Sequence, residues 1–258
     1  MTTPTAGPEH KGHVEPELYG TFDFIRRVPP PSGHYRWVYL WERPLRLMHW
    51  IAALCLVVLT ITGFYIGKPY FLTSGDTSRH FLMGWFRFAH FAAAAVFVMT
   101  GIIRMYWLFM GNRFERLPAL FPVRLRDWVN LFKMIKFYLM IEPEKAPRYL
   151  GHNPLQQMSY TGVYGLAVIS VLTGFALYGQ AEPGGFFHGL TGWLVSLVGL
   201  QGIRFIHHVV TWGFLIFIPI HIYLAVRADH IERTGVISSI ISGGRFVPSD
   251  EEFEDGNP

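Results

Sequence analysis

Cysteine is nearly absent from this chain, and the single one, Cys55, lies inside an apolar stretch. One cysteine excludes both a disulfide framework and a metal cluster that is held by thiolates of this chain alone. Charge is also scarce, at 16% of 258 residues, whereas hydrophobic residues make up 51% and aromatic residues 16%. This composition is too apolar for an ordinary soluble domain, and it makes the lipid bilayer the expected environment.

The start of the chain lacks the features of a removable signal peptide, which has a short apolar core followed by small residues at a cleavage site. Residues 1–40 are instead polar and contain several prolines. The formal charge of +4 does not indicate nucleic acid, because the Lys and Arg residues flank apolar stretches and form no basic face on a soluble domain. We expect no nucleic-acid partner, and we expect the first apolar stretch to stay in the mature protein.

Four long apolar stretches dominate the sequence, and each reaches the roughly 20 mainly apolar residues that a helix needs to cross a bilayer. They cover about residues 47–67, 85–110, 155–178 and 205–226. We predict an all-α membrane protein, a bundle of four transmembrane helices within residues 41–230. Residues 1–40 and 231–258 are expected to be terminal segments, the second with a mobile acidic end, and we find no internal repeat.

Basic residues are distributed unevenly between the connections. The segment up to Arg46 contains six Lys and Arg residues, the loop at 111–154 contains eight, and the tail from Arg227 contains three. The connection between spans one and two carries only Lys68 and Arg79, and the connection between spans three and four carries none. Because cytoplasmic loops are enriched in Lys and Arg, both termini and the 111–154 loop are predicted to be cytoplasmic.

The 111–154 loop is long enough to contain structure of its own. Residues 123–140 mix aromatic and apolar residues with Arg124, Arg126, Lys133 and Lys136. This pattern favours an amphipathic helix at the membrane surface. A helix packed on a partner protein fits the pattern equally well.

Histidine is the residue type that points to a function, since ionisable or coordinating side chains are costly inside a bilayer and usually mark a site. Five of the twelve histidines lie within or just inside the predicted spans: His49, His90, His207, His208 and His221. The other seven fall in predicted loops or termini, where a solvated surface position is the simpler interpretation: His10, His13, His34, His80, His152, His188 and His230.

The fourth span contains three of these histidines, and helix geometry separates them. His207 and His221 are fourteen residues apart, which is about 3.9 turns, so their side chains point in nearly the same direction about 21 Å apart along the axis. His208 lies roughly 140° away from His221 and is expected to face another neighbour or lipid. Pro219 loosens this angle without reversing the preference.

Two ligands this far apart on one helix face cannot bind a single metal centre, and they indicate two cofactors at different depths. The topology supplies a second histidine at each depth, because His49 lies at the cytoplasmic start of span one and His90 near the external start of span two. We predict the pairs His90 with His207 and His49 with His221. Two axial imidazoles on one iron are typical of a b-type haem that carries electrons, since no position is left for oxygen. Polar histidines bonded between helices are the alternative for each residue taken alone.

Two glycines suggest space for the porphyrins. Gly63 lies fourteen residues after His49, and Gly101 lies eleven after His90, each roughly on the face of its histidine. Each helix would then bind one haem and make room for the other. Ordinary close packing of membrane helices also explains such glycines.

Haem propionates need cationic or polar neighbours. Arg46 at the inner level, and Arg87 and Arg204 at the outer level, are candidates for these contacts. Anchoring of the helix ends in the correct orientation is the alternative role of these arginines.

Five segments carry a resemblance to a known family. They are RPLRLMHW at 43–50, FLMGWFRFAHF at 81–91, RYLGHNP at 148–154, the His207–His208 pair with His221, and SGGR at 242–245. In these segments the chain resembles the cytochrome b subunit of membrane-bound nickel–iron uptake hydrogenases, which is similar in plan to the gamma subunit of respiratory formate dehydrogenase. The resemblance covers most of the chain apart from the first 35 residues.

The resemblance implies a periplasmic partner, an iron–sulfur small subunit with its own C-terminal anchor helix, which passes electrons from a nickel–iron large subunit to the outer haem. The inner haem would then reduce quinone, and the chain would lie in the bacterial inner membrane. His152 and Asn153 offer polar groups for a quinone site at the depth of His49. A helix that begins at Pro154, with Asn153 as its cap, explains these residues equally well.

Two other functions are open. A formate dehydrogenase gamma subunit would have the same helices and haems, although the segments at 81–91 and 151–154 favour a hydrogenase subunit. A haem-free anchor or transporter would use its histidines to relay protons or to bind substrate. Transporters tend to interrupt their helices near the midplane, whereas these histidines lie toward two outer levels.

Overall fold

A computed structural model describes residues 34–71, 81–122, 125–138, 148–249 and 252–255. The helices are α1 (Arg43–Gly67), α2 (Leu82–Met110), α3 (Leu117–Leu120), α4 (Leu125–Tyr138), α5 (Pro154–Gly179), α6 (Phe186–Val198), α7 (Leu200–Glu232) and α8 (Val236–Ser242). The strands are β1 (Tyr35–Tyr39) and β2 (Gly244–Pro248). Several residues of the sequence analysis lie outside the described part of the chain: His10, His13, Arg79, His80 and Arg124.

Four helices, α1, α2, α5 and α7, are long and apolar enough to cross a membrane. Each contains one predicted span and extends it by one to several residues. Pro44 and Pro154 lie in the first turns of α1 and α5, where a missing N–H costs nothing. Pro219 lies inside α7, which nevertheless continues as one helix of 33 residues. The predicted four-helix membrane bundle is therefore confirmed.

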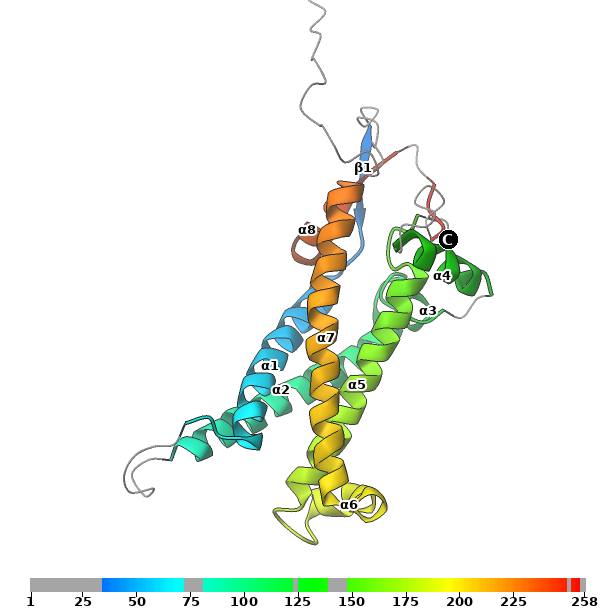
Figure 1. Ribbon diagram of the computed structural model, residues 1–258. Coiled ribbons are helices and arrows are strands. Elements are labelled where there is room, and N and C mark those ends of the chain that lie inside the picture. The colour runs from blue at the N-terminus through cyan, green and yellow to red at the C-terminus, as the bar shows by residue number, and fades with distance from the viewer. Residues whose placement is uncertain (1–33, 72–80, 123–124, 139–147, 250–251, 256–258) are drawn as a thin grey trace, which may run out of the picture.

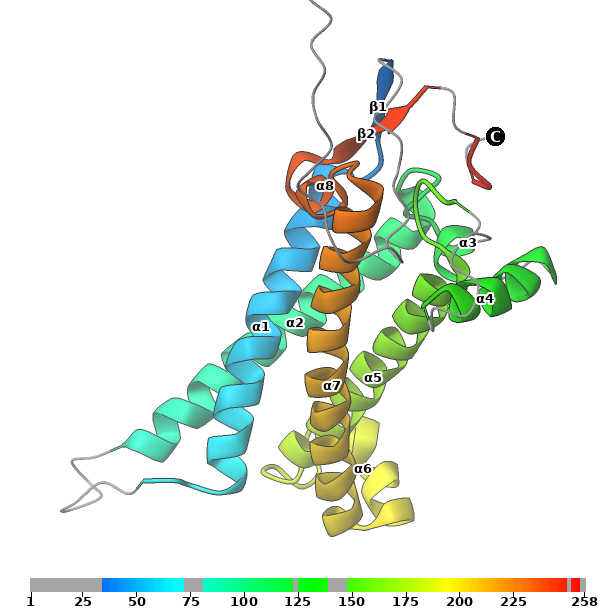
Figure 2. The same cartoon turned by 45° about the horizontal axis from the view of Figure 1, so that its top comes forward.

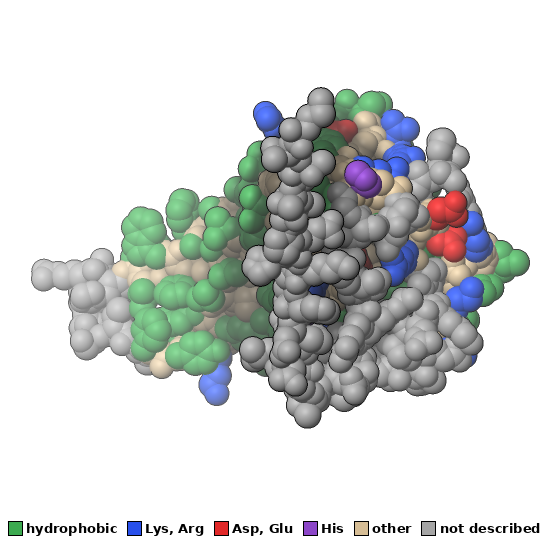
Figure 3. Space-filling view, turned by 90° about the horizontal axis from the view of Figure 1, so that it is seen from above, with side chains coloured by type: hydrophobic (Ala, Val, Ile, Leu, Met, Phe, Trp, Pro, Cys, Tyr) green, Lys and Arg blue, Asp and Glu red, His purple; other side chains and the backbone are tan. Residues whose placement is uncertain are grey.

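The membrane helices form two antiparallel pairs, α1 with α2 and α5 with α7 (Figures 1 and 2). Large apolar side chains remain exposed along their outer surfaces, for example Leu54, Met99 and Ile216. In the view from the end that carries β1 and α8, hydrophobic side chains cover the projecting α1–α2 pair, and acidic and basic side chains gather on the opposite side (Figure 3). Such apolar walls suit contact with lipid.

The shorter elements are divided between the two ends of the bundle (Figure 1). One end carries β1, β2, α3, α4 and α8 together with the last described residues, and the other end carries α6 between α5 and α7. Helix α6 has 13 residues, too few to cross a bilayer, and the sequence analysis did not predict it. The 111–154 loop and the described ends of the chain share one side of the bundle, and that this side is cytoplasmic stays a prediction from charge.

A helix does form in the middle of the 111–154 loop, as the sequence predicted. One face of α4 buries Leu131 and Met134 together with the polar residues Asp127 and Asn130, and the helix packs against α5. The opposite face exposes apolar side chains: Leu125, Trp128, Val129 and Phe132. An apolar outer face favours the membrane-surface interpretation of this helix.

Strands β1 and β2 pair in antiparallel register, from Tyr35 opposite Pro248 to Tyr39 opposite Gly244. The sequence analysis assigned these residues to two separate terminal segments and predicted no strand in either. Val247 lies on the buried side of the sheet and packs with Leu40 and Leu150 in a small hydrophobic core. The sheet therefore fastens the start of the described chain to its tail.

The acidic C-terminal end is also packed, which corrects the expectation of a mobile tail for residues 252–255. The Asp255 carboxylate accepts hydrogen bonds from the backbone N–H groups of Leu150 at 2.6 Å and Gly151 at 2.7 Å. Glu254 forms an ion pair with Arg126 of α4 at 3.2 Å. These contacts join the tail to the segment that precedes α5.

Arg245 of β2 makes the most extensive of these tail contacts. Its guanidinium is 5% exposed and donates to the carbonyls of Tyr149 at 2.6 Å and Leu150 at 2.8 Å. It also donates to the Glu232 carboxylate at the end of α7 at 2.6 Å. One buried side chain thus links β2, α7 and the loop before α5.

We expect Arg245→Leu to destabilise the fold by about 3 kcal/mol, because buried acceptors lose their donor. The matched control is Arg126→Leu, which removes an exposed ion pair and should cost less than about 1 kcal/mol. Thermal unfolding of the purified protein in lipid nanodiscs measures both. Equal effects of the two substitutions would show that Arg245 does not hold the tail.

Candidate functional site

The two histidines predicted at the inner level come from different helices, His49 from the second turn of α1 and His221 from the second half of α7. Their imidazole centroids are 6.4 Å apart, with the rings inclined by 52°. Two imidazoles on one metal ion have centroids about 6 Å apart when each metal–nitrogen bond is about 2 Å. The spacing fits an iron between the rings, and the buried Nδ1 of His49 has no hydrogen-bond partner.

The two histidines predicted at the outer level lie near the starts of α2 and α7. Nδ1 of His90 is 2.8 Å from Oγ1 of Thr62 on α1, and Nδ1 of His207 is 2.8 Å from Oγ1 of Thr173 on α5. His90 and His207 are also close enough to interact electrostatically. Each imidazole is held through one nitrogen by the partner helix of its own pair.

His208 is turned away from both pairs. Its side chain is exposed, and its Nδ1 lies 2.9 Å from the carbonyl oxygen of Arg204. Its Nε2 faces Gly67, where a Cβ would lie only 2.7 Å away. The structure thus places His49 and His221 face to face and His90 and His207 within electrostatic range. The adjacent His208 lies against the end of α1.

The two predicted glycines have different surroundings. A Cβ on Gly63 would lie 3.3 Å from Cε1 of His90, so this glycine lets the outer histidine approach α1 closely. Gly174, which the sequence analysis missed, has the same relation to His207 at 3.5 Å. Gly101 borders open space, with nothing among the described residues within 4 Å of a Cβ built there.

The predicted arginines are found at both ends of the bundle. Arg46 donates a hydrogen bond to the carbonyl of Ile241 in α8, and its Nε is buried without a partner. Arg87 and Arg204 have exposed side chains near the opposite end. Arg46 is therefore tied into the same end as the sheet, while the two outer arginines face the surroundings.

Asn153 is the cap of α5, as the helix-start interpretation predicted. Its Oδ1 accepts from the Gln156 backbone N–H at 3.0 Å, and Oε1 of Gln156 accepts from the Asn153 backbone N–H at 3.0 Å, which completes a capping box. His152 packs between Trp41 and Tyr160, with ring centroids 4.8 Å from each. Its Nδ1 is buried without a hydrogen-bond partner.

A buried polar cluster, which the sequence analysis missed, lies where α2 ends. Arg104 donates to the Tyr164 hydroxyl at 3.0 Å and to the Glu115 carbonyl at 3.1 Å. The Glu115 side chain is completely buried and accepts from the Trp107 indole N–H at 2.6 Å and the Glu42 backbone N–H at 2.5 Å. The sequence signal for this cluster was an arginine inside an apolar stretch. Its partners could not be recognised from the sequence, since Glu115 lies 11 residues away and Tyr164 lies 60 residues away.

These surroundings keep His152 uncharged. Burial, and after it the positive charge of Arg104, lower the pKa of His152 to about 3, against an opposite effect of the Phe114 carbonyl. Burial also raises the pKa of Glu115, although hydrogen bonds from the Glu42 and Trp107 N–H groups oppose this change. The cluster therefore places a neutral imidazole beside a buried arginine.

The low pKa predicts an acid dependence of stability. Between pH 6.5 and about pH 3 the unfolded chain takes up a proton on His152 and the folded protein does not, so folding stability falls as the pH falls. The expected loss is about 1 kcal/mol per pH unit. His152→Gln should flatten this dependence in thermal unfolding between pH 7 and pH 5, whereas the exposed control His230→Gln should not. An unchanged slope in His152→Gln would contradict the assignment.

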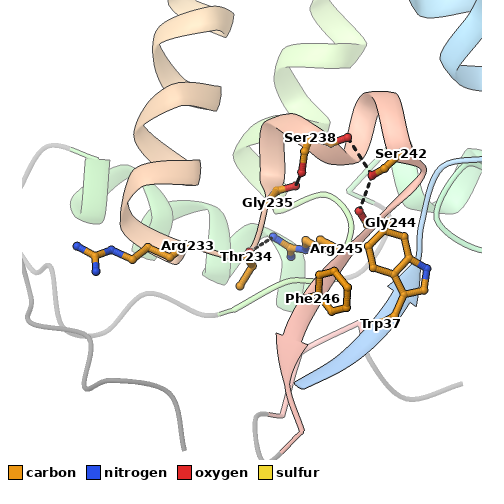
Figure 4. A pocket seen from close by; sticks show the side chains of 9 residues that line it. All are labelled: Trp37, Arg233, Thr234, Gly235, Ser238, Ser242, Gly244, Arg245 and Phe246. Atoms are coloured by element: carbon orange, nitrogen blue, oxygen red, sulfur yellow. Dashed lines mark hydrogen bonds between the residues drawn. The ribbon is translucent and has the colours of Figure 1, made fainter. Parts of the chain in front are cut away.

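A pocket of about 620 Å³ lies beyond the end of α7, between α8 and the β1–β2 sheet (Figure 4). In this view Arg245 turns toward Thr234, and the rings of Trp37 and Phe246 lie close together, with centroids 4.8 Å apart. None of the four paired histidines lines the pocket. It is therefore separate from the histidine sites.

The paired histidines define the class of the protein. Within the described residues there is no group of three or more His, Cys, Asp or Glu that could hold a bare metal ion. Imidazoles from facing helices of a membrane bundle, two at each level, are the arrangement that binds haem iron through both axial positions. The fold and the facing histidines indicate a membrane cytochrome of the b type.

The comparisons with known proteins agree with this class. The family model of prokaryotic cytochrome b561 matches residues 40–243, and the chain belongs to this family. A Probable Ni/Fe-hydrogenase B-type cytochrome subunit of Cupriavidus necator is 39% identical over 211 residues, which are 80% of this chain and 86% of the relative. The same-named protein of Azotobacter chroococcum is 40% identical over 218 residues, 83% of this chain and 90% of the relative.

A more distant relative, the Probable Ni/Fe-hydrogenase 1 B-type cytochrome subunit of Escherichia coli, is 34% identical over 213 residues, 80% of this chain and 90% of the relative. The resemblance that the sequence segments indicated is therefore confirmed.

Proposed function

We propose that this chain is the cytochrome b subunit of a membrane-bound nickel–iron hydrogenase and carries electrons from the hydrogenase to membrane quinone. Relatives that are named as Ni/Fe-hydrogenase cytochrome subunits support the hydrogenase partner. The observation that carries the proposal is the spacing of the His49 and His221 rings, 6.4 Å between centroids, which suits two ligands on one iron. The threonine contacts of His90 and His207 support a second pair at the other level. The proposed location is the bacterial inner membrane.

Haem b, when bound, would supply a one-electron carrier at each histidine pair. His90 with His207, and His49 with His221, would fill both axial positions and so exclude oxygen and substrate from the metal. The chain's own contribution is to hold neutral imidazoles at fixed spacing among apolar helices. Apolar surroundings limit water access and thereby help to set the reduction potential.

The order of the two pairs follows from α7. His207 lies near the α6 end, and His221 lies fourteen residues later, about 21 Å further along the axis. The α6 end has few basic residues and is predicted to face the periplasm, where an iron–sulfur small subunit with its anchor helix would dock. Helix α6 offers apolar side chains for such a contact: Phe186, Leu190, Trp193 and Leu197 are exposed. Electrons entering there would reach the outer pair first.

The arginines support propionate contacts at both levels. Three of the four histidines follow an arginine by three residues, namely His49 after Arg46, His90 after Arg87 and His207 after Arg204. Residues three apart are neighbours on one helix face, so each arginine precedes its histidine by about one turn of the helix. Arg46 also has a buried Nε without a partner, as a group that awaits an anionic neighbour would.

Quinone reduction is proposed near the inner pair, at the end of the bundle that carries the sheet. His152 provides an uncharged imidazole whose buried Nδ1 has no partner, and it contacts Trp41, eight residues before His49. Asn153 contributes through the α5 cap that fixes the position of His152. Proton uptake from this side, together with proton release outside by the partner, would add to a transmembrane proton gradient.

The two alternatives are less well supported. The names of the relatives favour a hydrogenase over a formate dehydrogenase gamma subunit. A transporter would have interrupted helices near the midplane, whereas α7 is continuous past both of its paired histidines. The hydrogenase assignment is tested directly by co-purification with a tagged chain and identification of the bound subunits.

Axial ligation is tested by substitution of the three α7 histidines. His207→Ala and His221→Ala should each lose one of two haems, because the remaining histidine cannot complete the axial pair. His208→Ala is the matched control and should retain both. Pyridine haemochrome assays and reduced-minus-oxidised spectra measure the haem content. Equal losses from all three variants, or no b-type signal in the unsubstituted protein, would refute the assignment.

Gly101 tests the proposed haem clearance at the inner level. An alanine at position 101 would border open space, so the helix should tolerate it. The change should stabilise the helix by about 1 kcal/mol, because alanine has a higher helix propensity than glycine. If the inner porphyrin occupies that space, Gly101→Ala should lower inner-haem content and leave the outer haem in place. Gly162→Ala in α5, which also borders open space, is the control. Full haem content in Gly101→Ala would remove this residue from the site.

A further inference from the structure

Two threonines hold the outer histidines in the same way. Thr62 of α1 contacts His90 of α2, and Thr173 of α5 contacts His207 of α7, with an Oγ1–Nδ1 distance of 2.8 Å in both cases. Both threonine side chains are buried. In each helix pair the first helix therefore supplies the threonine and the second helix supplies the histidine.

The same three residues recur at both places. Thr62 and Thr173 each begin a Thr-Gly-Phe segment, at 62–64 and 173–175. A Cβ at Gly63 would lie 3.3 Å from Cε1 of His90, closer than an ordinary contact, so this glycine leaves room for the ring. A Cβ at Gly174 would lie 3.5 Å from Cε1 of His207, in ordinary van der Waals contact. The chain thus repeats a local device in its two helix pairs, which the search for internal repeats in the sequence missed.

The hydrogen-bond directions follow from the backbone. Oγ1 of Thr62 lies 2.6 Å from the Val58 carbonyl, and Oγ1 of Thr173 lies 2.7 Å from the Ile169 carbonyl. A hydroxyl has one hydrogen and a carbonyl can only accept, so each hydroxyl donates to the backbone and accepts from the imidazole. Nδ1 of each ring therefore carries the hydrogen, and Nε2 keeps the lone pair that can bind a metal.

The inner pair is built differently. The buried Nδ1 of His49 has no hydrogen-bond partner within the described structure. An imidazole whose N–H is bonded to an oxygen acceptor is oriented by that bond and becomes a more basic ligand. Ligands of higher basicity stabilise ferric iron and lower the reduction potential. The outer histidines therefore have a hydrogen-bond acceptor at Nδ1, and His49 of the inner pair has none among the described residues.

We propose that Thr62 and Thr173 are positioning residues of the outer haem, which fix the tautomer and orientation of His90 and His207 and lower the potential of that haem relative to the inner one. This inference rests on the proposed function, because it concerns ligands of a haem. The resulting difference in potential favours electron movement from the outer pair to the inner pair. The hydroxyl, and not the methyl group, of each threonine produces the effect.

The test uses Thr62→Val and Thr173→Val, which keep the side-chain shape and remove the hydroxyl, beside Thr62→Ser and Thr173→Ser, which keep it. The carbonyls of Leu59 and Ser170, which also interact with the two rings, stay in place in all four variants. The control is Thr191→Val in α6, where a buried threonine donates to the Phe187 carbonyl at 2.7 Å and has no histidine contact among the hydrogen bonds of the described residues. Redox titration of the purified hydrogenase complex, followed optically and by EPR of the ferric haems, gives both potentials. His90→Ala assigns the outer signal.

Each valine variant should shift the reduction equilibrium of the outer haem toward the reduced form by up to about tenfold, or about 59 mV for a one-electron couple. The serine variants, the Thr191 control and the inner haem should stay at the wild-type values. Loss of the outer haem in the valine variants alone would also support the proposal. An unshifted outer haem in the valine variants, or equal haem loss in valine and serine variants, would overturn it. Absence of haem from the wild-type complex would instead refute the proposed function.

Discussion

A neutral imidazole buried among apolar helices needs a partner for each of its two nitrogens, since an unsatisfied polar group costs about 1–3 kcal/mol. In the outer pair one nitrogen of each ring is satisfied by a threonine of the neighbouring helix. The other nitrogen of each ring is the one that would bind the proposed haem iron. This requirement ties α1 to α2 and α5 to α7, and α7 then links the two levels because it carries one histidine of each pair.

The membrane helices, and the facing of His49 and His221, could be predicted because apolar length, helix periodicity and the distribution of basic residues can be read from the sequence. Apolar length defines a span, and the 3.6-residue period alone separates His208 from His207 and His221. The threonine contacts could not be predicted in this way, because Thr62 is 28 residues from His90 and Thr173 is 34 from His207. Their pairing depends on how neighbouring helices pack, and the repeated Thr-Gly-Phe was the only trace in the sequence.

The contacts at the end of the bundle that carries the sheet could not be predicted from the sequence either. Strands of five residues have little stability alone and form here through a partner about 200 residues away. Arg245, Asp255, Arg104 and Glu115 each contact a partner that lies 60 to 105 residues away in the chain. In contrast, the α5 cap was predictable, since Asn153, Pro154 and Gln156 are neighbours in sequence.

Strand β1 precedes the first membrane helix and β2 follows the last, so the strands can meet only after synthesis is complete and an even number of helices has crossed the bilayer. If one helix failed to cross the membrane, β1 and β2 would lie on opposite faces. Each strand would then have a row of unpaired backbone groups. The sheet therefore cannot close on a molecule in which one of the four membrane helices has failed to cross. Pairing of β1 with β2 is in this way a test of whether both strands lie on the same side of the membrane.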